Sequence, residues 1–317
     1  MTSALRPVFL IGAARSGTSL LYKGLCLHPE TAWISNWVRR FPRLAPLAAL
    51  NRTTSLAPRI RRQVWFGADS NAYVYGTKRK VWERIFPMPV EGETVYARSG
   101  IGADGKANGE EAAQQAAALR RQFGLIHQFA GGRVFINKRI ANNRRIPLLL
   151  DAFPDARFIE IIRDGRAVAY SLSRVDWWPD SHVWWYGKSP KEWDAEGKDP
   201  WELCARNWVE EIREIRRGKQ LVPDGQLLEV KYEDFLENPL EGFIRLANFS
   251  DLEPVSKWQN ALRELSFPDK NEAWRRRLNS AAIATIEDVQ RETLTSLSYD
   301  VGSSHREVDL IREDPIR

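Results

Sequence analysis

Two glycines with four residues between them, Gly12 and Gly17, lie in the run GAARSGTS. This spacing is typical of loops whose backbone N–H groups surround a phosphate or a sulfate, when a strand precedes the loop and a helix follows it. A nucleoside triphosphatase carries a lysine after the second glycine, where Thr18 stands in this chain. Positive charge must then come from Arg15, which favours an anionic ligand other than ATP with magnesium. The alternative is a tight turn that binds nothing.

Arg163 and Ser171 form a second candidate anion site. Arg163 follows the apolar run of residues 157–162, and Ser171 lies eight positions later, about two turns into an expected helix. A guanidinium fork and a hydroxyl suit a phosphomonoester. In the alternative interpretation, Arg163 caps strand carbonyls and Ser171 is merely small enough to pack.

Two further polar residues close expected strands. Lys138 follows Asn137 at the end of one strand, and Tyr232 opens the run Tyr-Glu-Asp after another. Each has a plain structural alternative, since a lysine at a strand end is often a surface group and a tyrosine there is often core material.

These motifs resemble those of the sulfotransferases that use 3′-phosphoadenosine 5′-phosphosulfate (PAPS). Residues 14–19 match the family's first loop, and Arg163 with a serine eight positions later is similar to its 3′-phosphate motif. His28, with the proline after it, resembles a pair found in the bacterial and tyrosylprotein branches. Asn271 with Trp274 is similar to a C-terminal feature of bacterial members, although a core role explains these two equally well. The resemblance runs from about residue 7 to residue 299.

The resemblance implies a role for each matching residue. It assigns the 5′-phosphosulfate to four consecutive residues, Ser16, Gly17, Thr18 and Ser19. Arg15 would neutralise the leaving phosphate, and Lys138 would approach the transferred sulfuryl group. The 3′-phosphate would bind Arg163 and Ser171, with Tyr232 near it or the adenine. PAPS is then the donor and 3′-phosphoadenosine 5′-phosphate (PAP) the product, and no metal is needed because the donor carries an activated leaving group.

The general base of the family has no counterpart at its usual positions. Cytosolic members place a histidine two residues past the lysine, where Ile140 stands, and tyrosylprotein-like members place a glutamate near Ser35 and Asn36. An alcohol must nevertheless lose a proton, usually to a His or Glu within hydrogen-bond distance. The replacement candidates are four carboxylates and two histidines: Asp69, Glu83, Glu91, Glu93, His127 and His182. Each carboxylate taken alone is more often a solvated surface group.

Apolar periodicity predicts the elements that must position these residues. Short apolar runs predict strands at residues 7–12, 134–136, 157–162 and 227–230. Helical spacing predicts helices at residues 18–27, 110–129, 143–153, 166–174, 203–216, 240–248, 254–265 and 279–297. This alternation indicates an α/β fold, a P-loop-like doubly wound parallel sheet flanked by helices, with ligands at the carboxyl ends of the strands.

The expected organisation is a single sulfotransferase domain over residues 1–299, followed by a polar tail over 300–317. Between residues 42 and 109, prolines and glycines predict loops and short helices. Two segments, about 31–109 and 176–200, are expected to shape the acceptor site.

Positive charge is concentrated in one segment. Residues 31–68 hold seven arginines and no acid, whereas the net charge of the whole chain is +6. This pattern argues against a protein that coats nucleic acid. It favours one surface that binds an anionic partner or guides an anionic substrate, and peripheral contact with an anionic membrane is one such interaction. A solvated arginine-rich connection between helices is the alternative.

Seven of the thirteen tryptophans fall between residues 177 and 208. Trp201 and Trp208 have helical spacing and are expected in the core. The tryptophans among polar residues at 177–185 are expected either to form a lid that stacks on a sugar or aromatic acceptor, or to pack beneath a long loop.

Composition excludes several classes of protein. Hydrophobic residues at 43% and charged residues at 28% indicate a folded globular chain. Two distant cysteines and four scattered histidines argue against a zinc site or a disulfide framework and agree with a cytoplasmic location. We see no signal peptide and no run of about 18 apolar residues.

The sequence therefore predicts a PAPS-dependent sulfotransferase that acts on a hydroxyl, less readily on an amine, of a glycan, a glycolipid or a small molecule. The alternatives are a P-loop kinase-like phosphotransferase and a non-catalytic nucleotide-binding protein associated with anionic membranes.

Overall fold

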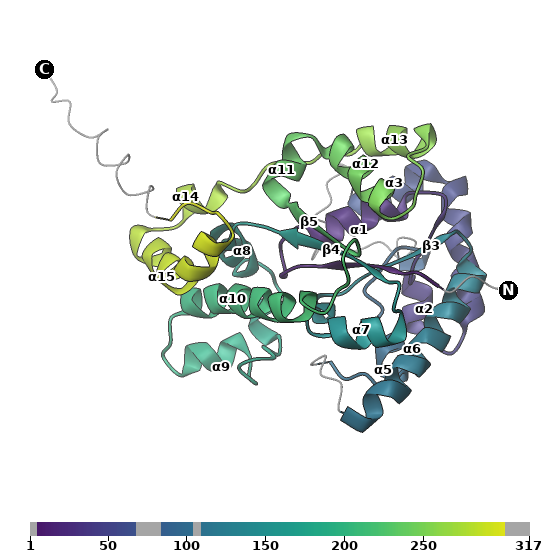
Figure 1. The fold of residues 1–317 in the computed structure, drawn as a ribbon. Helices are drawn as coiled ribbons and strands as arrows, with labels where there is room; N and C mark the ends of the chain where they lie inside the picture. The colour runs from purple at the N-terminus through teal and green to yellow at the C-terminus, as the bar shows by residue number, and fades with distance from the viewer. Residues whose placement is uncertain (1–4, 68–83, 104–108, 302–317) are drawn as a thin grey trace, which may run out of the picture. The chain divides into compact units, whose positions relative to one another are not determined.

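A computed structural model describes residues 5–67, 84–103 and 109–301 of the 317-residue chain. The chain forms two compact units (Figure 1). The first unit comprises residues 1–163 and 213–269, and the second comprises residues 164–212 and 270–317. Nearly all of the predicted tail lies outside the described residues. In the described part of the chain, no helix combines the length and the hydropathy that a membrane crossing requires.

The first unit is built on a five-stranded sheet in which every pair of neighbouring strands is parallel. Its strands are β1 Val8–Ile11, β2 Thr31–Ala32, β3 Val134–Lys138, β4 Arg157–Ile162 and β5 Leu227–Lys231, in the order β2-β3-β1-β4-β5. The chain adds β2 and β3 on one side of β1 and then β4 and β5 on the other side. The predicted α/β class and its parallel sheet are confirmed, and the two-residue β2 is too short to show an apolar pattern.

Both faces of the sheet are covered, because alternate residues of a strand point to opposite sides. Val8 and Leu10 join a core with the helices α1 (Thr18–Cys26), α12 (Pro239–Phe249) and α13 (Ser256–Arg263). Phe9 and Ile11 join the opposite core with α6 (Gly109–Ala130) and α7 (Ile146–Ala152). The continuous apolar runs of the strands reflect this two-sided burial.

The predicted helix over residues 110–129 corresponds to α6 and is confirmed. Its buried positions Ala116, Leu119, Phe123 and Ile126 are four of the five that helical spacing singles out. Short elements fill the remaining part of the first unit: α2 Asn36–Arg40, η1 Ala45–Leu56, α3 Pro58–Phe66, α5 Glu93–Arg98, η2 Ile140–Arg144 and α11 Tyr232–Glu237. The loops and short helices expected between residues 42 and 109 are therefore present wherever that region is described.

The second unit is helical. It contains α8 Gly165–Leu172, η3 Trp178–Asp180, α9 Pro190–Ala195, the first part of α10 Pro200–Lys219, α14 Ala273–Arg277 and α15 Ser280–Ser296. Its interior holds a buried ionic group, in which Arg166 contacts Asp164 at 2.9 Å and Glu287 at 2.8 Å. The guanidinium of Arg166 lies 4.7 Å from the ring centroid of the buried Trp274, which supports the core role of that tryptophan.

Most tryptophans of the second unit are buried or half-buried, which favours packing over an open lid, and Trp201, expected in the core, is half-buried. Trp178, Trp193 and Trp208 are buried. The indole N–H of Trp184 donates to the Glu211 carboxylate at 2.8 Å. Trp177 is the exception, with 45% of its surface exposed.

Candidate active site

The loop between β1 and α1, residues 12–17, is called the glycine loop here. Gly12 has φ 147° and Gly17 has φ 92°, a region that glycine enters without steric cost. A Cβ atom on Gly12 would lie 2.6 Å from the Ile161 carbonyl oxygen, and one on Gly17 would lie 2.3 Å from the Tyr232 ring. Both positions therefore require glycine, for space as well as for backbone conformation.

Asn143 of η2 fastens the start of the glycine loop. The Gly12 N–H donates to Asn143 Oδ1 at 3.0 Å, and Asn143 Nδ2 donates to the Gly12 carbonyl at 3.1 Å. Asn143 is fully buried. No sequence motif predicts Asn143 as part of the site, because a contact across 131 positions leaves no local pattern.

The glycine loop contains a buried hydroxyl that suits an anion. Ser16 is 1% exposed, and its Oγ has no hydrogen-bond partner among the described residues. Leaving a buried polar group unpaired costs about 1–3 kcal/mol. The loop also ends at the N-terminus of α1, where the N–H groups of the first turn point outward and the helix dipole attracts negative charge. The residues present therefore fit a phosphate or phosphosulfate group.

Arg163 and Tyr232 lie against the same loop. Arg163 follows β4, is buried, and donates from Nη1 to the Arg15 carbonyl at 2.8 Å. Its guanidinium lies 4.7 Å from the centroid of the Tyr232 ring, which directly follows β5. Arg163 thus does bind a carbonyl, as the capping interpretation expected, but that carbonyl belongs to the glycine loop.

Ser171 lies in α8, in the second unit, whereas Arg163 is the last residue of the first segment of the other unit. Their convergence on one phosphate stays a prediction. The Asp164 side chain caps α8 by accepting from the Arg166 N–H at 2.8 Å.

Lys138 ends β3, the strand beside β1, and only 4% of it is exposed. Its ammonium forms an ion pair with Glu91, and Arg139 pairs with Glu93. Partial burial would raise the pKa of Glu91, but Lys138 and then Arg139, 4.0 Å away, outweigh burial and hold that pKa below its usual value. The Glu91 carboxylate is therefore charged at neutral pH, and its main partner is the nearly buried ammonium of Lys138.

A buried hydrogen-bond network holds this pair in place. The Tyr96 hydroxyl donates to Asn137 Oδ1 at 2.7 Å, and Asn142 Nδ2 donates to the Tyr96 hydroxyl at 3.1 Å. Asn137 Nδ2 in turn reaches the Glu91 carbonyl at 3.5 Å. The end of β3 and the segment that carries Glu91 are therefore connected through side chains, none of which the motifs had singled out apart from Asn137.

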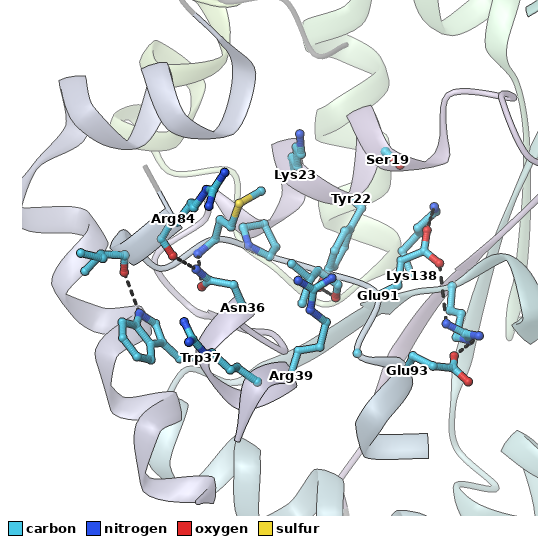
Figure 2. A pocket seen from close by; sticks show the side chains of 17 residues that line it. Ser19, Tyr22, Lys23, Asn36, Trp37, Arg39, Arg84, Glu91, Glu93 and Lys138 are labelled. Atoms are coloured by element: carbon cyan, nitrogen blue, oxygen red, sulfur yellow. Dashed lines mark hydrogen bonds and ion pairs between the residues drawn. The ribbon is translucent and has the colours of Figure 1, made fainter. Parts of the chain in front are cut away.

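Beside Lys138 lies a pocket of about 1100 Å³ (Figure 2). It is lined by residues of α1, of α2, of the segment 84–93 and of the end of β3. Figure 2 shows Lys138 and Glu93 at one side and Trp37 and Arg84 at the other. Ser19, directly after the start of α1, also lines it, so the pocket adjoins the helix that follows the glycine loop.

The remaining candidate bases are Asp69, Glu83, His127 and His182. Asp69 and Glu83 are outside the described residues. His127 contacts the Gly132 carbonyl at 3.1 Å and does not line this pocket, and His182 belongs to the second unit. Among the residues that the structure describes, no three His, Cys, Asp or Glu side chains gather as metal ligands would.

His28 and Ser35, at the positions where the family resemblance drew attention, have structural roles. The His28 ring contacts the Glu253 carbonyl at 2.8 Å and meets the Trp258 ring edge-on. Ser35 Oγ accepts from the Val38 N–H at 3.3 Å and so caps α2.

The fold and the loop define an α/β protein whose glycine loop, arginine and lysine lie at the carboxyl edge of a parallel sheet. The chain belongs to the sulfotransferase family, since the family model described as "Sulfotransferase family" matches residues 7–257. It is accordingly an enzyme of the sulfotransferase class, and the resemblance of the motifs is confirmed at the level of the family.

Solved structures share the fold at low sequence identity. The sulfotransferase STF9 of Mycobacterium avium is 14% identical, with a TM-score of 0.57 over 95% of this chain and 79% of that one. The sulfotransferase STF1 of Mycobacterium tuberculosis is 16% identical, with a TM-score of 0.55 over 91% and 76%. The sulfotransferase domain of the Synechococcus olefin synthase is 16% identical, with a TM-score of 0.51 over 95% and 98%. No curated protein matched in a search with the sequence.

Proposed function

We propose that the protein transfers a sulfuryl group from PAPS to a hydroxyl of an acceptor bound in the pocket beside Lys138. The observation that carries this proposal is the ion pair between Glu91, at the wall of an open pocket, and the buried Lys138, on the strand next to the glycine loop. A cation for sulfuryl oxygens and a carboxylate for a hydroxyl proton are the two groups that such a transfer uses.

The donor supplies a sulfuryl group on an activated phosphate. We assign the 5′-phosphosulfate to Ser16, Gly17, Thr18 and Ser19, and the unpaired Ser16 hydroxyl supports this assignment. Arg15 neutralises the phosphate that leaves. Arg163, stacked on Tyr232, binds the 3′-phosphate, and Ser171 is its predicted companion from the sequence motif.

Lys138 and Glu91 act on the transfer itself. The Lys138 ammonium stabilises negative charge on the sulfuryl oxygens, which is where a positioned cation lowers the barrier. Glu91 accepts the proton of the acceptor hydroxyl, and Glu93, held by Arg139, is the second candidate for that role. These charges are provided by side chains, so we propose no metal for this step. The acceptor is a glycan, a glycolipid or a small molecule, and the site of action is the cytoplasm.

Calorimetric titration with PAP, and separately with ATP and magnesium, tests the donor. We expect PAP to bind more tightly than ATP, and Arg163→Ala to weaken PAP at least tenfold because a buried phosphate ligand is lost. Arg59→Ala, an exposed arginine of α3, is the control and should bind PAP like the wild type. Preference for ATP would favour the kinase-like alternative. Binding of neither would favour the non-catalytic membrane-associated protein.

A further inference from the structure

The charges around the pocket indicate which class of acceptor it takes. Resting on the proposed function, we propose that the acceptor carries an anionic group of its own, a carboxylate, sulfate or phosphate, and that Arg39, Arg40 and Arg84 bind it. The hydroxyl that is sulfated would then lie at the Lys138 side of the pocket, and the anionic group at the arginine side.

The pocket holds two kinds of cation. Lys138 and Arg139 have carboxylate partners inside it, Glu91 and Glu93. Lys23 donates to the Trp65 carbonyl at 2.7 Å. Arg39, Arg40 and Arg84 also line the pocket, but none of the three forms an ion pair with a described residue. The pocket arginines that form no ion pair with a described residue therefore all lie on the side formed by α2 and residue 84.

The two segments that carry these arginines are fixed to each other. The Asn36 side chain donates to the carbonyls of Arg84 at 3.0 Å and Phe86 at 3.1 Å. The Trp37 indole donates to the Ile85 carbonyl at 2.6 Å. Figure 2 shows Arg39 between the Lys138 side of the pocket and Arg84. The arginines thus belong to one built wall.

The remaining arginines of the acid-free segment 31–68 have different surroundings. Arg52 donates to the Ala130 carbonyl at 3.0 Å, Arg61 lies 5.6 Å from the Trp65 ring centroid, and Arg62 pairs with Glu264. Arg43 and Arg59 are exposed and do not line the pocket. The segment therefore does more than carry a solvated basic face, because part of it is structural and part of it faces the acceptor pocket.

The chemistry of the wall suits an anionic acceptor with an apolar or ring-shaped body. Guanidinium groups bind carboxylate, sulfate and phosphate through paired hydrogen bonds. Trp37 and Ile85 provide apolar lining next to them, on which a sugar or aromatic ring can pack. A neutral acceptor would offer these three arginines no opposite charge.

Matched probes that differ by one charge test this inference. We would measure binding of p-nitrophenyl β-D-glucuronide and of the neutral p-nitrophenyl β-D-glucoside to the PAP-loaded protein by calorimetry. The glucuronide is expected to bind about tenfold more tightly, with a preference that shrinks at high salt because the arginines are exposed. In the double variant Arg39→Gln/Arg84→Gln the preference should fall to about twofold or less, while the Arg43→Gln/Arg59→Gln control should keep it.

PAP affinity separates failure of this inference from failure of the proposed function. Equal binding of the two probes, binding of neither, or an unchanged preference in the Arg39/Arg84 variant would overturn the anionic acceptor, even with PAP bound. Absence of PAP binding would overturn the proposed function itself. Sedimentation with phosphatidylglycerol and phosphatidylcholine vesicles identifies the source of the anion: phosphatidylglycerol binding that depends on Arg39 and Arg84 assigns it to a lipid headgroup. Glucuronide preference without vesicle binding assigns it to a soluble acceptor.

Discussion

Glu91 combines two properties that single residues seldom share. Its carboxylate lines an open pocket, and it is paired with a lysine that is almost fully buried. In the proposed reaction, a Lys138 ammonium that binds the sulfuryl oxygens would be shared between the donor and Glu91, and weaker pairing would raise the proton affinity of the Glu91 carboxylate.

Glu91→Gln should lower kcat by about 10²–10³, the usual contribution of a positioned general base, with the Kd for PAP unchanged. The control is Glu93→Gln, two residues away in the same pocket but paired with Arg139, which should lower kcat by less than about tenfold. Steady-state kinetics with PAP titration on each variant measures both quantities. A larger loss for Glu93→Gln would transfer the role of base to Glu93.

Gly17→Ala should abolish detectable PAP binding and lower the melting temperature. The added Cβ would meet the Tyr232 ring at 2.3 Å, at a backbone φ of 92° that alanine avoids. Gly124→Ala in α6 is the matched control, since nothing lies within 4 Å of its Cβ, and it should stabilise the protein by about 0.5–1 kcal/mol. Normal PAP affinity in Gly17→Ala would show that the loop tolerates a side chain and is no tight cradle.

At the scale of elements, the glycine loop depends on how β1 is connected to η2. The reciprocal hydrogen bonds between Gly12 and Asn143 fix the point where the strand becomes a loop. The loop is thus held from outside by a residue that need not touch the donor.

Asn143→Ala should weaken PAP binding about tenfold or more and destabilise the fold, because the N–H and C=O of Gly12 are left buried and unpaired at about 1–3 kcal/mol each. Asn143→Asp keeps the acceptor for the N–H and loses the donor, so its effect should be intermediate. Chemical denaturation and PAP titration measure the two losses. Equal effects of both substitutions would contradict the reciprocal bond.

The pH dependence of stability below neutrality should include His28. Burial lowers the pKa of His28, and the Glu253 carbonyl and the Glu30 carboxylate oppose burial only in part. The unfolded state therefore binds a proton first: the stability from neutral His28 is fully present above about pH 6.5 and is lost as the pH falls through the folded-state pKa. Denaturation midpoints from pH 7 to pH 5 should fall less in His28→Gln than in the wild type. Burial also lowers the pKa of His127, so His127 accounts for the pH dependence of stability that remains in His28→Gln.

Local patterns predicted those parts of the site that lie next to a strand. The glycine loop, Lys138, Arg163 and Tyr232 each follow a short apolar run, and a parallel sheet brings such ends together. Asn143, Tyr96 and Asn142 could not be found in this way, since their partners lie far away in the sequence and their types are ordinary. Glu91 emerged only as one of several carboxylates, because nothing in its own segment marks its contact with Lys138.

At the scale of the whole chain, positive charge and site coincide only in part. The arginine-rich segment supplies two residues of the pocket wall, Arg39 and Arg40. Other arginines of the segment hold the fold through contacts away from the pocket. A net charge of +6 is thus a poor guide to the site by itself, whereas the positions of individual arginines are informative.

PAP should stabilise the folded protein as a whole. A ligand at about 100 times its Kd adds about 2.7 kcal/mol to the free energy of unfolding if it binds the folded state alone. Thermal unfolding with PAP should therefore shift upward in the wild type and in Arg59→Ala, and markedly less in Arg163→Ala. An equal shift in Arg163→Ala would remove that arginine from the phosphate site.

The central position of β1 in the sheet affects how the chain folds during translation. Val8 pairs with Ile136 on one side and with Arg157 on the other, so β1 is translated well before both of the strands that enclose it. At ordinary rates of translation, the apolar run Val8–Ile11 waits on the order of ten seconds for its neighbours. During that interval the run lacks the neighbours that bury it, and exposed apolar strands favour association with other chains, so we expect the nascent chain to be most prone to aggregation before β4 has emerged.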